Sequence, residues 1–188
     1  GGLSQIYSSI EENNMDIVLL EKSPKIAVYS PDDKQPWDDA VTLALTYAEI
    51  DYTTIFDQEV LTGELKNFDW LHLHHEDFTG QYGKFYKNYR NSNWYKQQVN
   101  DFTATATQFG FSSVPELKKT IAVKIKSFVN NGGFLFAMCS ATDSFDIALA
   151  AINVDIADVP FDGTPVEAGF AAKLNFSNSI AFENYQLY

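Results

Sequence analysis

A chain of 188 residues, 45% of them hydrophobic and 20% charged, is long enough to fold as one domain with a substantial core. Acidic residues outnumber basic ones 25 to 13, and the net charge of −12 argues against a nucleic-acid-binding protein, because phosphate recognition needs a basic surface. No stretch approaches the roughly 20 continuous apolar residues of a membrane span. The single cysteine excludes a disulfide within the chain.

The first part of the chain predicts a strand, a helix and two further strands. Residues 1–24 are polar and weakly patterned, and we interpret them as an N-terminal extension or linker. A β-branched run at 25–30, stopped by a proline, predicts a buried strand. Pro36 then suits the first turn of a helix in which apolar residues recur at spacings of three and four. Strands are predicted next at 52–56 and at 69–75.

The second part of the chain predicts more helix. Residues 76–112 are too long and too aromatic for a simple connection, and we expect an inserted helical excursion there. The next helix begins after Ser113, which has a glutamate three residues later, as in a capping box. A fourth strand is predicted at 134–138, followed by a helix capped by Ser140 or Asp143.

This alternation of strands and helices predicts a parallel sheet covered by helices on both faces, in one α/β domain at residues 25–188. In such sheets ligands bind beyond the carboxyl ends of the strands. The residues that directly follow each strand are therefore the candidates for a functional site.

Cys139 follows the fourth predicted strand and precedes a helix, which is the place of a nucleophile on a strand-to-helix elbow. The N-terminus of the helix would offer backbone N–H groups and a positive dipole end, and both favour a thiolate. Ala137 and Ala141 are small enough for such a sharp turn. The alternative is a structural thiol buried in the core, since free cysteine is among the most buried residue types.

The three histidines of the chain, His72, His74 and His75, all lie at the end of the third predicted strand. His74 or His75 could act as a general base toward Cys139, with Glu76 or the aspartate after it orienting the ring. A metal site is a second reading, because His72, His74 and Glu76 would point to one face of the strand. A third is that His72 is a hydrogen-bonded core residue and the others are polar groups at a strand end.

Three aspartates resemble the acidic pocket of a phosphate-accepting receiver domain: Asp32, Asp33 and Asp57. The order of the elements argues against this interpretation, because the accepting aspartate would follow the third strand, where this chain has histidines. We therefore expect these acids to cap a helix and to keep the edge of the sheet solvated.

Residues 82–90 interleave aromatic side chains with the densest basic charge of the chain. Stacking on nucleobases or sugars is one interpretation. A packing stripe with a solvated opposite face is favoured, because 15% of all residues are aromatic.

Three runs carry a resemblance to a known family: KIAVYSPDDKQPWDDAVTLALTYAEIDY, DWLHLHHEDFTGQYGKFY and GGFLFAMCSATDSFDIALA. Over most of residues 14–188 the chain resembles a family of larger bacterial proteins labelled asparagine synthetase B. It shows neither the N-terminal-cysteine glutaminase domain nor the ATP-pyrophosphatase domain that this label implies. The resemblance implies instead a class I glutamine amidotransferase-like fold: a three-layer α/β/α, flavodoxin-like parallel sheet with a helical insertion.

The resemblance also implies roles for the residues after the strands. Cys139 matches the elbow nucleophile, and backbone N–H groups at Ser140 and near Glu76 would hold an oxyanion. The loop after Glu76 is not glycine-rich and no histidine follows Cys139, which are two departures from the pattern of the fold. The expected function is a thiol-dependent amide hydrolase in which His74 or His75 moves the proton. The alternative is a non-catalytic ligand- or carbohydrate-binding scaffold.

We expect no cofactor, and as partners a small-molecule ligand and flanking domains of a longer protein, with no nucleic acid and no membrane span. The apolar, strand-like run at 181–188 suits a fragment of such a protein.

Overall fold

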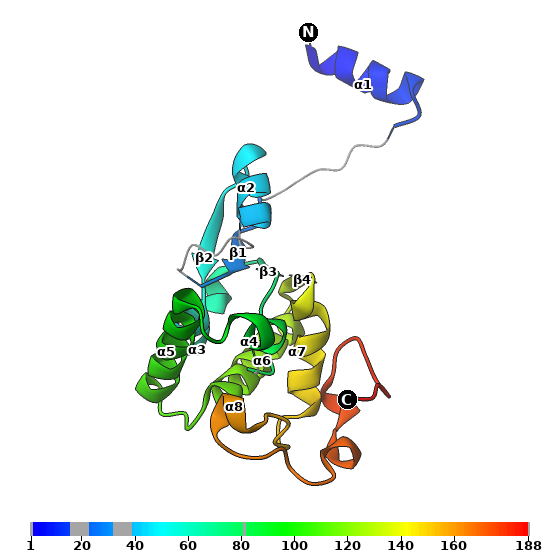
Figure 1. Ribbon diagram of the computed structural model, residues 1–188. Helices are drawn as coiled ribbons and strands as arrows, with labels where there is room; N and C mark the ends of the chain where they lie inside the picture. Colours follow the sequence, from blue (N-terminus) through cyan, green and yellow to red (C-terminus); the bar gives the residue numbers. More distant parts are fainter. Residues whose placement is uncertain (1, 16–22, 32–38, 81, 188) are drawn as a thin grey trace.

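The computed structural model describes residues 2–15, 23–31, 39–80 and 82–187. Four strands form a single sheet in the order β2-β1-β3-β4, and each neighbouring pair is parallel (Figure 1). The strands are β1 (Ile26–Tyr29), β2 (Tyr52–Ile55), β3 (Trp70–Leu73) and β4 (Phe134–Ala137). The chain therefore has the expected three-layer α/β/α, flavodoxin-like fold, and all four predicted strands are confirmed.

The helices are α1 (Gly2–Glu12), α2 (Asp39–Tyr47), α3 (Asp57–Thr62), α4 (Gly83–Tyr89), α5 (Asn93–Gln108), α6 (Val114–Asn130), α7 (Ser140–Ala150) and α8 (Val159–Asp162). Short 3₁₀ helices are η1 (Glu64–Asn67), η2 (Phe170–Lys173) and η3 (Phe176–Asn178). The expected helical insertion between β3 and β4 is confirmed as α4 and α5. None of the described helices is long and apolar enough to cross a membrane.

The main core lies on one face of the sheet, against α3, α6 and α7. The register places Tyr29 of β1 between Ile55 of β2 and Leu73 of β3. Because side chains alternate between faces along a strand, these three point to the same side. The buried stripe of α6, which includes Leu117 and Ile121, packs against them.

The opposite face of the sheet is covered less completely. There residues of α2 line a hollow together with His72 and His74, which face that side. Phe134 and Phe136 of β4 remain 55% and 44% exposed, because no described helix lies over them. The expectation that helices cover both faces is thus met by α2 alone on this side and fails at β4.

Helix boundaries agree with the capping signals in one case and not in another. Ser113 caps α6, its Oγ accepting a hydrogen bond of 3.3 Å from the backbone N–H of Glu116. At α7 the N-cap is Cys139, not the predicted Ser140 or Asp143, and no side chain caps this helix. The reason is that Ser140 Oγ donates instead to the carbonyl of His75, at 2.6 Å.

The two ends of the chain differ from the expectations. Residues expected to be an unpatterned extension contain the helix α1, in which Ile6 and Ile10 are four residues apart and share one side. The expected strand at 181–188 is absent from residues 181–187. There the backbone N–H groups of Ala181 and Phe182 donate to one carboxylate, that of Asp146 in α7.

Candidate functional site

Cys139 has the backbone geometry of an elbow. Its φ of 52° and ψ of −134° lie in a region that residues other than glycine rarely adopt. The preceding residue is still bound to the sheet, because Met138 N donates to Leu73 O at 2.9 Å, and α7 begins directly afterwards. The thiol is exposed, so the alternative of a structural cysteine buried in the core is wrong.

The N-terminus of α7 presents an unused donor beside this thiol. None of the hydrogen bonds between described residues uses the backbone N–H of Ser140, the residue predicted to hold an oxyanion. The side chain of Ser140 ties the elbow to the end of β3 through the carbonyl of His75. The elbow and the histidine segment, which are far apart in the sequence, are therefore neighbours in space.

His72 and His74 face one side of the sheet and His75 faces the other, as the alternation of side chains along a strand predicts. The ring centroids of His74 and His75 are 3.6 Å apart, and those of His72 and His74 are 6.1 Å apart. His75 lines the large cavity described below, whereas His72 and His74 line a second hollow beneath α2. A role for either His74 or His75 as a base toward Cys139 stays a prediction.

Glu76 does not join the imidazoles in a metal site. Its carboxylate accepts a hydrogen bond of 2.9 Å from the backbone N–H of His74, and the residue lines the large cavity. Among the described residues no group of three histidine, cysteine or acidic side chains could hold a metal ion. The metal reading that joined His72, His74 and Glu76 is therefore wrong.

His72 is buried on the α2 side of the sheet, as the third reading expects, but the hydrogen bond of that reading is missing at Nε2. This side chain is only 5% exposed, and Nε2 has no hydrogen-bond partner in the described part of the chain. Burial lowers the pKa of His72. Its ring stacks on that of Phe136, with centroids 5.4 Å apart.

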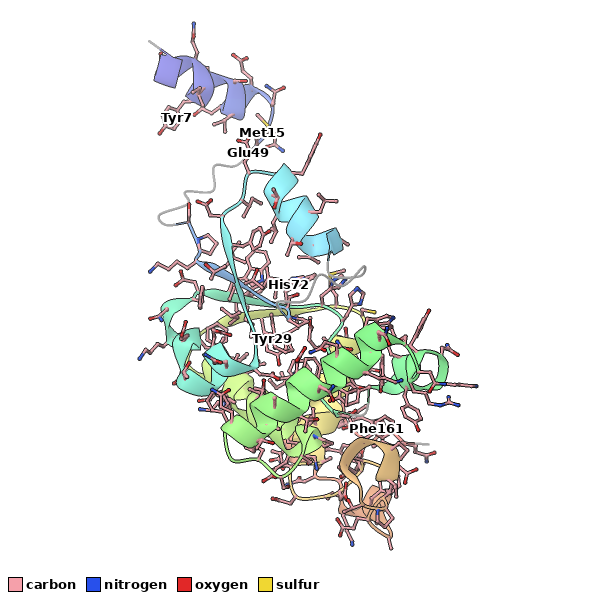
Figure 2. The ribbon with its side chains drawn as sticks, turned by 60° about the vertical axis from the view of Figure 1, so that its left-hand side comes forward. Tyr7, Met15, Tyr29, Glu49, His72 and Phe161 are labelled. Atoms are coloured by element: carbon pink, nitrogen blue, oxygen red, sulfur yellow. The ribbon has the colours of Figure 1, made fainter. Side chains whose placement is uncertain are left out.

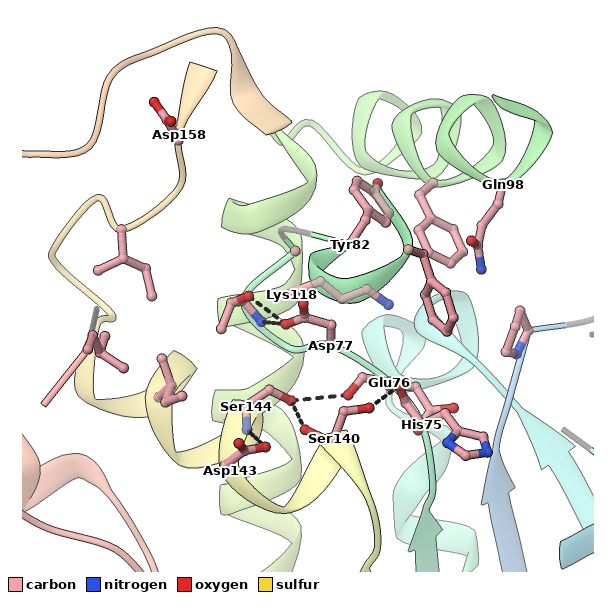
Figure 3. A pocket seen from close by; sticks show the side chains of 18 of the residues that line it. His75, Glu76, Asp77, Tyr82, Gln98, Lys118, Ser140, Asp143, Ser144 and Asp158 are labelled. Carbon is pink, nitrogen blue, oxygen red and sulfur yellow. Dashed lines mark hydrogen bonds between the residues drawn. The ribbon is translucent and has the colours of Figure 1, made fainter. Parts of the chain in front are cut away.

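A cavity of about 630 Å³ opens beyond the carboxyl ends of the strands, where the fold predicts a ligand site (Figure 3). Residues of α5, α6, α7 and the loop after β3 line it. Ser140 and His75, on either side of the elbow contact, are among the lining residues, and Cys139 is not. The thiol thus lies next to a residue of the cavity wall without forming part of that wall.

Hydroxyl groups of α7 hold the loop after β3 against the cavity. Ser144 Oγ lies 3.1 Å from the carbonyl of Glu76 and 2.6 Å from that of Ser140, and it accepts a hydrogen bond from Phe78 N at 3.2 Å (Figure 3). This network fixes the loop that the amidotransferase-like interpretation assigns to oxyanion binding.

A buried ion pair joins α6 to α3 at the cavity wall. Lys118 and Asp57 are 2% and 1% exposed, and Lys118 Nζ lies 2.8 Å from both carboxylate oxygens. The ammonium also donates to Tyr29 Oη at 3.0 Å, and the Tyr29 hydroxyl donates to Asp57. Burial, and next the Asp57 charge, raise the pKa of Tyr29 well above its usual value.

Sequence reasoning missed this pair. The expectation that Asp57 caps a helix and keeps the sheet edge solvated is wrong, because Phe56 is the N-cap of α3 and Asp57 is buried. Asp32 and Asp33, which share that expectation, lie outside the described residues. A signal was present, because Lys118 falls on the apolar stripe of its helix, four residues after Val114 and three before Ile121. A lysine in that position has to be paired or to reach solvent.

Asp77 is a second acidic group of the cavity. Its Oδ1 accepts a hydrogen bond of 2.9 Å from the backbone N–H of Thr79. Burial raises the pKa of Asp77, and the charge of Asp143 adds to the rise, while the Thr79 hydrogen bonds and Lys118 oppose it.

The aromatic side chains at 82, 85 and 86 pack against other aromatic rings and Tyr89 is 44% exposed, which agrees with the favoured interpretation of a packing stripe with a solvated opposite face. The ring of Tyr82 lies 5.8 Å from that of Phe102, and the ring of Tyr86 lies 5.3 Å from that of Phe161.

Comparison of the chain with protein-family models, with curated proteins and with solved structures finds no match.

Proposed function

We propose that this chain is a thiol-dependent hydrolase with a class I glutamine amidotransferase-like site, in which Cys139 attacks the carbonyl carbon of an amide or ester. The exposed thiol at a positive φ of 52°, directly before a helix, is the observation that carries this proposal. Such an elbow costs conformational strain, and strain of this kind accumulates at functional sites.

The remaining roles follow from the neighbours of the thiol. The Cys139 sulfur forms a bond to the carbonyl carbon, and the backbone N–H of Ser140 stabilises the negative oxygen. The thiol proton passes through His74 or His75 to the leaving group, whose bond to the carbonyl carbon then breaks. Water hydrolyses the resulting thioester and restores the thiol. His75 is the better placed of the two to reach a ligand, because it lines the cavity.

Alkylation with iodoacetamide at neutral pH tests the proposal directly, since Cys139 is the only thiol in the chain. We expect Cys139 to react at least about tenfold faster than N-acetylcysteine, as activated thiols do. Mass spectrometry measures the rate, and circular dichroism confirms that the fold is intact. A folded protein whose thiol reacts no faster than the small molecule would contradict the proposal.

Variants of the two histidines decide which one moves the proton. If His75 does, His75→Gln slows both alkylation and hydrolysis of a chromogenic ester, and His74→Gln leaves both within about twofold. The Cys139→Ser variant is the control for background hydrolysis. Equal rates in the unaltered protein and in both histidine variants would remove the catalytic role of both imidazoles.

A non-catalytic ligand-binding domain is the second candidate function. It is favoured by the absence of Cys139 from the cavity wall and by the absence of any histidine after His75. This candidate predicts that Cys139→Ala binds small molecules in the cavity as well as the unaltered protein does, and that the thiol is inert to alkylation.

A further inference from the structure

Strand β4 is an edge of the sheet, and its outer side carries unpaired backbone groups. Among the described strands it pairs only with β3. The backbone N–H groups of Phe134 and Met138 donate toward β3, both at 2.9 Å. Since successive residues of a strand direct these groups to opposite sides, those of Leu135 and Ala137 point away from the sheet. No hydrogen bond between described residues uses the backbone N–H of either one.

The side chains along this edge are apolar and exposed. Phe134, Phe136 and Met138 alternate along the chain, and they are 55%, 44% and 38% exposed. They lie on the α2 side of the sheet, where Met138 lines the hollow beneath α2 and the ring of Phe136 stacks on that of His72. An apolar row beside unpaired backbone groups is a template for the addition of another strand.

The edge also lacks the features that ordinarily keep edge strands apart. Charged residues and prolines block many such edges. Residues 127–142, which contain β4 and both of its flanks, include neither. The net charge of the chain is −12, so two copies repel each other least where the chain carries no charge. The other edge strand, β2, is polar instead, because it exposes Thr53 and Thr54.

Two-fold symmetry determines how a second copy fits this edge. Two identical edge strands related by a two-fold axis are antiparallel, and the assembly closes after two copies. With the axis at Phe136, Leu135 of each copy lies opposite Ala137 of the other, and each such pair exchanges both of its N–H···O bonds. The two Phe136 residues then face each other with Cα atoms about 4.5 Å apart. Aromatic pairs across two strands stabilise a sheet.

We propose that β4 is a self-association surface, at which a second copy of this chain continues the sheet as an antiparallel strand centred on Phe136. Three features of one strand specify this partner: the unpaired backbone groups require a strand, the exposed row requires apolar side chains, and the missing charge requires a neutral edge. Because strands of four residues bury little surface, the association is weak and depends on protein concentration. The inference does not depend on the reactivity of Cys139.

Sedimentation equilibrium under reducing conditions measures the association. We expect the average mass of the unaltered chain to rise from that of one chain at about 5 µM to nearly that of two chains at about 500 µM. Phe136→Lys places two like charges opposite each other, and we expect it to keep the mass of one chain throughout. The matched control is Thr53→Lys, at an exposed position of the other edge strand, which should associate as the unaltered chain does. Circular dichroism confirms that both variants are folded.

Disulfide formation tests the register and introduces no charge. The single cysteine is first replaced by Cys139→Ser, and Phe136→Cys is then added. The Cα atoms of a disulfide lie about 4.4–6.8 Å apart, so the proposed register brings the two new thiols within range. We expect mild oxidation to link at least about fivefold more Phe136→Cys chains into dimers than Thr53→Cys chains in the same background.

A mass of one chain at every concentration would overturn the inference. So would species larger than two chains, association that Phe136→Lys leaves unchanged, or equal cross-linking at positions 53 and 136. Association through α1 would also overturn it, and Ile6→Asp, at a position that is 56% exposed, would then abolish the association while Phe136→Lys would not.

Discussion

At the scale of single residues, the most consequential feature is the lysine buried in the wall of the cavity. Lys118 and Asp57 are separated by 61 positions, and each would be an uncompensated charge in the core without the other. Pairing two buried charges recovers their desolvation cost only when geometry and hydrogen bonds are good, as they are here. The stability of the pair therefore depends on keeping both members.

Removing one member should be costly. Lys118→Met leaves Asp57 buried beside Tyr29 without a counter-charge, and we expect a loss of about 3–5 kcal/mol in the free energy of unfolding. Urea denaturation measures it. Lys124→Met, at an exposed position of the same helix, is the control and should stay within about 0.5 kcal/mol.

The double variant Lys118→Met with Asp57→Asn should recover part of the loss, because the neutral amide has no charge left to bury. A cost for Lys118→Met no greater than that of Lys124→Met would show that the pair contributes nothing to the fold.

At the scale of elements, α7 connects the candidate site to the C-terminal segment. Its first residue, Ser140, binds the end of β3, and Asp146, in the middle of the helix, binds the segment after η3. The Asp146 carboxylate accepts backbone N–H bonds from Ile180, Ala181 and Phe182, at 2.7–2.8 Å. One side chain thus holds a stretch with no regular structure of its own.

Asp146→Asn tests this connection. An asparagine retains one acceptor oxygen but replaces the other with an NH₂ group, so at least one of the three bonds is lost and those that remain are no longer charge-assisted. We expect a loss of about 2 kcal/mol in the free energy of unfolding and faster amide hydrogen exchange at residues 180–182. The exposed Asp51→Asn is the control. Unchanged exchange at these amides would contradict the role of Asp146.

At the scale of the whole molecule, the sheet is closed on one face and partly open on the other. Figure 2 shows Tyr29 and His72, which belong to adjacent strands and lie on opposite faces of the sheet. Parallel sheets are ordinarily buried on both faces, so the exposed aromatic rings of β4 depart from the usual pattern. Side chains on the two faces should therefore differ in what they contribute to stability.

Two substitutions compare the faces. Leu73→Ala, at a fully buried position of β3, should cost about 2–5 kcal/mol, because it leaves a cavity in the main core. Phe136→Ser on the exposed side of β4 should cost less than about 1 kcal/mol, since much of its surface already meets water. Urea denaturation compares them. An equal cost would mean that the open face is covered in solution.

Part of the candidate site could be predicted from the sequence. The elbow at Cys139 could be predicted because a strand runs directly into a helix there. The proximity of the histidine segment to this elbow could be predicted because the carboxyl ends of parallel strands meet at one edge of the sheet. The cap of α7 could not be predicted, because Ser140 is drawn to a carbonyl 65 positions away. The metal reading failed for a local reason, since the Glu76 carboxylate accepts a hydrogen bond from the backbone N–H of His74, two residues earlier.

The sequence by itself determined the order of strands and helices, the parallel α/β class and the elbow, because these depend on periodicity and turn residues within a few positions. Only the tertiary structure decided the partner of Lys118, the anchoring of the C-terminal segment by Asp146, the open face of β4 and the acidic, aromatic wall of the cavity. Each of these depends on which distant segments meet, and local patterns carry no information on such contacts.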